Sequence, residues 1–98
     1  MAKQLRNSEI EEDLEYIPLD DDEVWTSYDL GCSAALLTAG FELLTLDRTN
    51  QHKVKFVFKR EANIEKVADS FWSNNLEQKT RSYWDNIKTL KNRLYSGD

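Results

Sequence analysis

Hydrophobic and polar residues alternate most regularly along residues 53–60, KVKFVFKR. One side of an extended chain would carry the hydrophobic residues Val54, Phe56 and Phe58. The other side would carry three lysines and a valine, namely Lys53, Lys55, Lys59 and Val57. This pattern predicts a strand with one buried and one solvent-exposed face, as in an antiparallel sheet that helices cover on one side only.

Two further segments have the composition of strands. Residues 41–48, FELLTLDR, precede the first strand, and the linking residues TNQH contain no glycine, which predicts a hairpin with a loop of four to five residues. Residues 23–28, EVWTSY, are rich in β-branched and aromatic side chains and predict a short edge strand. We expect the domain to begin at this strand.

Residues 29–39 have the pattern of a helix between the strands. Asp29 or Ser27 can cap its N-terminus, and Leu30, Ala34 and Leu37 recur at the spacing of one apolar face. Gly40 stands where a helix commonly ends in a left-handed residue. Small residues on this helix would allow close packing against a sheet.

Two more helices are predicted in the second half of the chain. Asn63 can cap the first of them, residues 64–75, whose apolar face consists of Ile64, Val67, Ala68 and Phe71. The second runs from about residue 77 to 95 and has an apolar face of Tyr83, Ile87, Leu90 and Leu94. The order β-α-β-β-α-α therefore predicts an α+β fold with a small antiparallel sheet and helices packed on one face.

Charge divides the chain of 98 residues into two parts. Residues 1–23 contain nine acidic and two basic residues, a net charge of -7, whereas residues 24–98 contain nine acidic and eleven basic residues, a net charge of +2. This asymmetry predicts a flexible acidic N-terminal arm, residues 1–23, and a single α+β domain, residues 24–98. The arm could order on a basic partner or fold back on the domain's own basic face.

Candidate chemistry is sparse. Cys32 and His52 are the single cysteine and the single histidine, so neither a disulfide nor a zinc site of four such ligands can form within the chain. No GxGxxG or GxxxxGKS loop is present, and the acidic run before Val24 lacks the register of a calcium loop. We therefore expect no enzymatic activity, no catalytic residue, no metal and no cofactor. We interpret Cys32 as a small buried thiol.

The cellular location follows from the same features. The sequence shows no apolar run of about 18 residues that could span a bilayer. Its first residues lack the apolar core of a secretory signal, and a lone cysteine fits a reducing compartment. We expect a cytoplasmic protein without membrane contact.

Basic and aromatic side chains suggest one type of binding surface. They lie on the polar side of residues 53–60 and along the last helix, and the candidates for nucleic-acid binding are Lys53, Lys55, Lys59, Arg81, Trp84, Lys88, Lys91 and Tyr95. Purely structural roles would also fit these residues. The lysines could protect an exposed sheet edge from pairing, and Trp84 could widen the apolar face of the last helix.

Acidic and aromatic residues suggest a protein interface. Trp and Tyr often anchor protein interfaces, and this short chain carries many large rings. The candidates for partner binding are Glu11, Glu12, Asp20, Asp21, Asp22, Trp25 and Trp72. Our leading hypothesis is a non-enzymatic interaction protein that docks on a larger protein or nucleoprotein, and the alternative is a nucleic-acid-binding module. The oligomeric state is left open.

Residues 26–74 and 82–96 together resemble a family of short bacterial, archaeal and phage proteins known as an uncharacterised domain of unknown function. The shared pattern includes YDL, the alanine–leucine helix, GFEL, the VKFVF strand, FWSN and the final LKNRLY. The resemblance implies this fold and a phage or mobile-element setting. It implies no activity and assigns no functional residue. By analogy with other small phage proteins, we expect an accessory or inhibitor of a larger complex.

Overall fold

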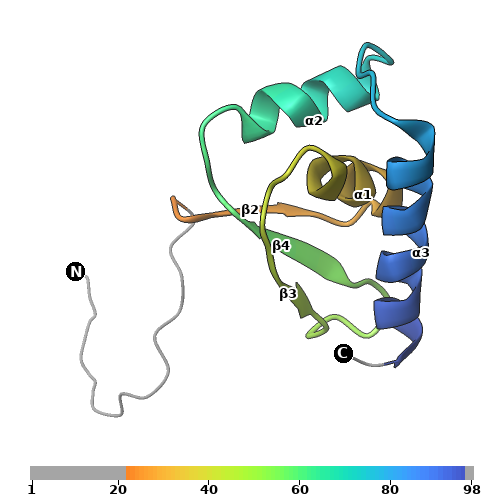
Figure 1. Ribbon diagram of the computed structural model, residues 1–98. Coiled ribbons are helices and arrows are strands. Elements are labelled where there is room, and N and C mark those ends of the chain that lie inside the picture. Colours follow the sequence, from red (N-terminus) through yellow and green to blue (C-terminus); the bar gives the residue numbers. More distant parts are fainter. Residues whose placement is uncertain (1–21, 97–98) are drawn as a thin grey trace.

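The computed structural model describes residues 22–96 and contains the predicted order of elements (Figure 1). These elements are β2 (Val24–Ser27), α1 (Leu30–Thr38), β3 (Leu43–Asp47), β4 (Lys55–Lys59), α2 (Ile64–Trp72) and α3 (Thr80–Ser96). The protein has an α+β fold, with a small antiparallel sheet and helices on one face. The arm residues 1–21 lie outside the described residues.

The sheet has the strand order β2-β4-β3, and both pairings are antiparallel. β4 is therefore the central strand, so its lysines cannot protect an exposed edge, and the prediction of that role is wrong. Val57 lies on the lysine face but is only 8% exposed. Its direct neighbours across the sheet are Thr26 and Thr45, and flanking strands on both sides shield a central residue even on an uncovered face.

β3 is shorter than the predicted segment and carries a bulge. Leu43 lies opposite Phe58 and Thr45 lies opposite Val57, so Leu44 is an extra residue without a partner in the ladder. The extra residue turns the Leu44 side chain away from the interior and leaves it 37% exposed. The connection from β3 to β4 is also longer than predicted, since β4 begins only at Lys55.

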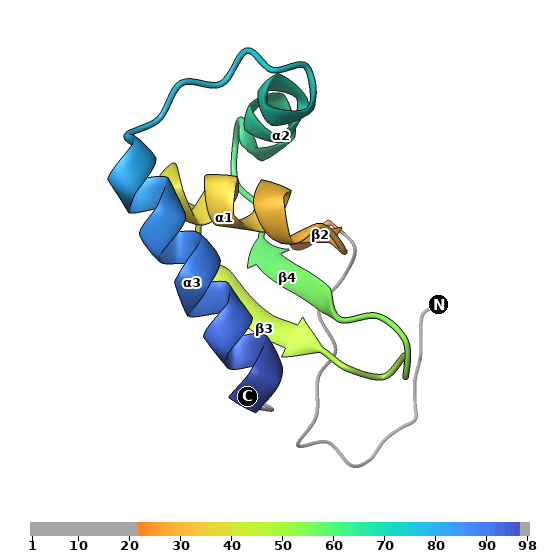
Figure 2. The same ribbon diagram turned by 90° about the vertical axis from the view of Figure 1, so that its right-hand side faces the viewer.

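α1 is buried on more sides than its predicted apolar face. Five consecutive residues are fully buried, namely Cys32, Ser33, Ala34, Ala35 and Leu36, whereas Leu30 and Leu37 are only partly buried. Figures 1 and 2 show the reason, because α1 lies between α2 and the sheet while α3 runs along its side. A helix enclosed by its neighbours no longer needs a single apolar stripe.

Both ends of α1 form as predicted. The Asp29 carboxylate accepts a hydrogen bond of 2.7 Å from the Cys32 amide and caps the N-terminus. At the other end Gly40 has a φ of 101°, and the amides of Gly40 and Phe41 bind back to the carbonyls of Leu37 and Leu36. This pair of hydrogen bonds is a Schellman motif, which requires a left-handed residue at the Gly40 position.

α2 begins and ends at left-handed asparagines. Asn63 precedes the helix with a φ of 75°, but its side chain makes no capping hydrogen bond, so the predicted side-chain cap is wrong. Asparagine is instead used here for its tolerance of positive φ. Asn74 has a φ of 64° and repeats the Schellman motif after the last turn, with its amide bound to the Phe71 carbonyl.

α3 is fastened to α1 by polar side chains as well as by its apolar face. Leu90 is 0% exposed in the core. The Tyr83 hydroxyl donates to the Gly31 carbonyl at 3.2 Å, and Asn86 donates to the Thr38 hydroxyl at 3.0 Å. A β-carbon at Gly31 would meet Phe71 and Tyr83 at 3.2 Å, so all three helices meet closely there.

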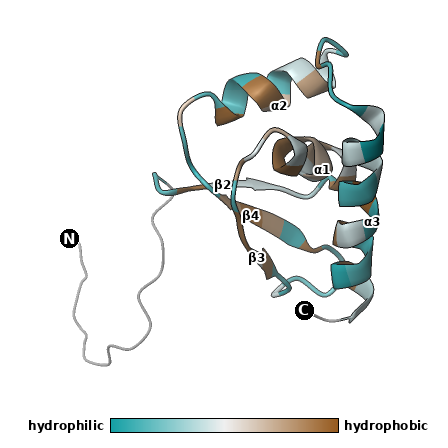
Figure 3. Ribbon diagram, viewed as in Figure 1, coloured by the Kyte–Doolittle hydropathy of each residue, from teal (hydrophilic) through white to brown (hydrophobic). Residues whose placement is uncertain are grey.

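The core lies between the sheet and the helices. Its largest fully buried side chains include Phe58, Leu36, Ile64 and Leu90, one from each of β4, α1, α2 and α3. Figure 3 shows hydrophobic colours concentrated on β3, β4 and α1, while α3 is mostly hydrophilic. Among the helices of residues 22–96, none is long and apolar enough to cross a bilayer.

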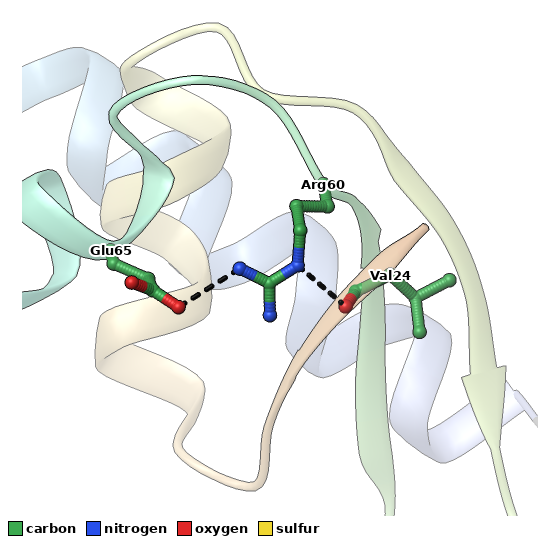
Figure 4. A network of polar contacts seen from close by, with 3 residues as sticks. All are labelled: Val24, Arg60 and Glu65. Carbon is green, nitrogen blue, oxygen red and sulfur yellow. Dashed lines mark hydrogen bonds and ion pairs between the residues drawn. The ribbon is translucent and has the colours of Figure 1, made fainter. Parts of the chain in front are cut away.

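Arg60 joins the end of β4 to two other elements (Figure 4). Its Nε donates to the Val24 carbonyl at 3.3 Å, and one terminal nitrogen lies 2.9 Å from the Glu65 carboxylate. The Arg60 and Glu65 side chains are 36% and 66% exposed, so solvent screens the ion pair and its own contribution to the free energy is small. The contacts nevertheless define how the first turn of α2 leaves the sheet.

Candidate binding surfaces

The uncovered face of the sheet carries a tyrosine bordered by two lysines. Tyr28 follows β2 and is 51% exposed. The Lys53 Nζ lies 5.2 Å from the centroid of its ring, and the Lys55 Nζ lies 5.8 Å from it. Both distances allow a cation–π attraction, which here is partly screened by water. Sequence reasoning did not link Tyr28 to these two lysines, because they are more than 20 residues away along the chain.

The rest of this face has short side chains at its centre and charged side chains toward its ends. Its central row consists of Thr26, Val57 and Thr45. Lys59 is exposed at one end of β4, and Asp47 lies opposite Lys55 at the other. The Asp47 carboxylate accepts hydrogen bonds from the amide and hydroxyl of Thr49, and these bonds lower its pKa, with a smaller contribution from Lys55.

The end of α3 lies at the same end of the sheet as Tyr28 but on the covered side, where Leu94 lines a cleft with the core residue Phe56. Tyr28 and Lys53 line a cleft of about 360 Å³ together with His52 and Leu94. Arg48, from the start of the hairpin connection, donates hydrogen bonds to the carbonyls of Arg93 and Leu94. The connection between β3 and β4 is thereby attached to α3, which brings residues from the two predicted basic segments close together.

One side of α3 carries the second group of predicted residues. Arg81, Trp84, Lys88, Lys91 and Tyr95 recur at helical spacing, and each of them is exposed. Trp84 is 53% exposed and Tyr95 is 82% exposed. Trp84 therefore does not widen the core, and the prediction of that structural role is wrong.

An acidic residue moderates the charge of this side. Asp85 lies 3.5 Å from the Arg81 guanidinium and 3.7 Å from the Lys88 ammonium. The Lys88 Nζ also lies 5.9 Å from the centroid of the Trp84 ring. The Trp84 ring is therefore set among paired charges rather than on a uniformly basic surface.

The candidates for protein binding are distributed unevenly. Trp25 is partly buried against the core, so it contributes mainly to folding. Trp72 is 61% exposed at the end of α2 and lies edge-to-face against Phe71. Asp22 is exposed in a turn before β2. The other acidic candidates lie outside the described residues, namely Glu11, Glu12, Asp20 and Asp21.

A polar cluster that the sequence did not predict surrounds the start of α1. The Cys32 thiol is fully buried, and its pKa is raised by that burial and by the nearby Asp29 carboxylate. Burial and Asp29 also raise the pKa of Tyr83, whose hydroxyl comes from α3. These surroundings keep the thiol protonated and make it a poor nucleophile. No motif in the sequence signals that Tyr83 approaches Asp29.

Metal ligands do not converge in the part of the chain that the structure describes. Within residues 22–96, no three side chains of His, Cys, Asp or Glu are placed to hold a metal ion together.

Comparison with known protein families assigns most of the chain. The model of the family described as domain of unknown function DUF5659 matches residues 25–96. This chain belongs to that family. The DUF5659 match extends from β2 through α3, so it includes both the Tyr28 face and the exposed side of α3. Neither a curated protein nor a solved structure matches the chain.

Proposed function

We propose that this DUF5659 domain is a binding module that docks on a larger protein through the exposed side of α3. The observation that carries the proposal is the exposure of Trp84 and Tyr95, which are 53% and 82% accessible on one side of a helix. Large rings on a rigid helix lose little conformational entropy on binding and are frequent hot spots. A partner pocket for these rings, bordered by acidic groups, would complement Arg81, Lys88 and Lys91.

The role that suits such a module is that of an accessory or inhibitor of a larger complex. The resemblance of the chain to a family of short bacterial, archaeal and phage proteins supports this role and a mobile-element origin by analogy. The acidic residues 1–23 would supply a second contact to a basic part of the same partner. A lone, buried and protonated thiol suits a reducing compartment, and we place the action of the protein in the cytoplasm.

The test is quantitative affinity capture of the full chain from its native cells. The double variant Trp84→Ala/Tyr95→Ala removes both rings, and the control Ser82→Ala/Thr89→Ala changes two exposed positions on another side of α3. We expect the control to retain the captured partner and the ring variant to lose about tenfold or more of it. Equal capture by both variants contradicts the proposed surface. Deletion of residues 1–22 tests the arm separately, since unchanged capture would exclude a contribution from it.

A further inference from the structure

Edge protection does not account for the lysines of β4. β4 is the central strand, yet Lys55 and Lys59 project from its uncovered face, and Lys53 precedes them on the same side. Two of these ammonium groups lie within 6 Å of the Tyr28 ring centre, at 5.2 and 5.8 Å. This face therefore carries a half-exposed ring with two cations close to it.

We propose that the uncovered face of the sheet binds single-stranded nucleic acid, with one base stacked on Tyr28 and the adjoining phosphates held by Lys53 and Lys55. A ring stacks on any base, and lysine neutralises the phosphates on either side of it. In a duplex both faces of each base are already covered, so a lone exposed ring selects unpaired strands. This site is separate from the side of α3 proposed to dock on protein.

The neighbouring structure suits a bound strand. The central row of Thr26, Val57 and Thr45 contains no bulky side chain, so a backbone can cross it closely. Arg48 holds the hairpin connection to α3 before any ligand arrives, which reduces the entropy lost on binding.

Charge on this face favours a polyanion. Asp47 is the acidic residue paired directly across from Lys55, and its carboxylate is occupied by hydrogen bonds from Thr49. Glu42 is exposed beside the other end of β4, where its carbonyl accepts the Lys59 amide, and the Asp29 carboxylate after Tyr28 caps α1. Glu61, Glu65 and Asp69 belong to α2 and the turn before it. A strand lying across Tyr28 would therefore meet more positive than negative side chains.

The experiment is fluorescence anisotropy with labelled oligothymidine and oligouridine of about 15 nucleotides, and with a duplex of equal length. We expect the full chain to bind both single strands more tightly than the duplex, with affinity that falls as salt rises. Tyr28→Ala should weaken binding by about tenfold, and Tyr28→Phe should retain it because the ring remains. Tyr28→Leu keeps hydrophobic bulk without a ring and should behave like Tyr28→Ala.

Charge variants complete the test. The pair Lys53→Gln/Lys55→Gln should weaken binding and reduce its salt dependence by about two phosphate contacts. The matched control Lys66→Gln/Lys79→Gln removes the same charge from exposed positions outside the sheet and should leave affinity unchanged. The proposal is overturned if the unmodified chain binds no single strand at low salt, if Tyr28→Leu binds as well as Tyr28→Phe, or if the control loses as much affinity. None of these results depends on the Trp84 surface.

Discussion

The Arg48 guanidinium donates a hydrogen bond of 2.9 Å to the backbone carbonyl of Arg93, a residue 45 positions later in the chain. A second bond of 3.4 Å reaches the carbonyl of Leu94. Carbonyls in the last turn of a helix lack partners within the helix and carry partial negative charge. The Arg48 side chain therefore caps α3, the longest helix, and holds the hairpin connection and the end of α3 in a defined position relative to each other.

Arg48→Ala should lower the free energy of unfolding by about 1–2 kcal/mol, because it removes two charge-assisted hydrogen bonds at a partly buried site. Urea denaturation of the two proteins measures the difference. The control is Arg81→Ala, whose side chain is 85% exposed and makes one ion pair, and it should change stability by less than about 0.5 kcal/mol. Equal losses in both variants would show that the Arg48 cap stabilises the fold no more than an exposed ion pair does.

Ser33→Ala should leave stability unchanged or raise it by up to about 1 kcal/mol. The Ser33 side chain is fully buried, and within the described residues its hydroxyl has no hydrogen-bond partner. The contrasting variant is Thr38→Val, because the Thr38 hydroxyl donates to Ala34 at 2.7 Å and accepts from Asn86 at 3.0 Å. Thermal unfolding should show a clear loss for Thr38→Val only. A destabilised Ser33→Ala protein would reveal a partner for the hydroxyl.

Gly40→Ala should destabilise the protein by about 1 kcal/mol through the backbone alone. Gly40 has a φ of 101°, and no atom lies within 4 Å of the position that a β-carbon would take. The cost therefore arises from the conformation and not from a clash. Asn74→Gly, at a φ of 64°, removes a β-carbon from a similar helix end and should change stability little. Chemical denaturation of both variants checks this, and a neutral Gly40→Ala would contradict the argument.

Alkaline pH should unfold the protein through Cys32 and Tyr83. Both pKa values are raised above the ordinary values of 9.0 and 10.0, mainly by burial. The folded state thus favours the protonated groups, and their contribution is complete below pH about 9 and is lost as pH rises through the folded pKa values. The free energy of unfolding, measured from neutral to alkaline pH, should therefore fall above about pH 9.

Variants assign this alkaline loss to the two groups. Cys32→Ala/Tyr83→Phe should show a flatter dependence above pH about 9, although its stability at neutral pH will be lower. The single variants should fall between the double variant and the unmodified protein. In the folded state the Cys32 thiol should also react far more slowly with a thiol reagent than in denaturant, since it is 0% exposed. An alkaline loss that persists in the double variant would point to other groups.

Much of the fold could be predicted because local physics fixes it. Alternation along KVKFVFKR predicted β4, and the Asp29 cap and Gly40 stop placed both ends of α1 correctly. The apolar faces of α2 and α3 were also predicted, since each of these helices covers the core with one side only. Errors occurred where neighbours changed the local preference. Asn63 was expected to cap through its side chain, but it is used for its left-handed backbone.

The candidate surfaces were predicted only in part. Spacing along one helix is enough to group Trp84, Lys88 and Tyr95, because residues three, four and seven apart share a side. No such rule links Tyr28 to Lys53 and Lys55, which meet only because β2 pairs with β4.

The sequence by itself determined the elements, their order, the acidic character of residues 1–23 and the lack of a recognisable catalytic motif, because these depend on composition and on contacts between near neighbours. The tertiary structure decided the rest. Strand order made β4 central, enclosure by its neighbours buried α1 on several sides, and the packing of α3 left Trp84 and Tyr95 exposed. Such outcomes depend on which distant segments meet, and no short window of sequence contains that information.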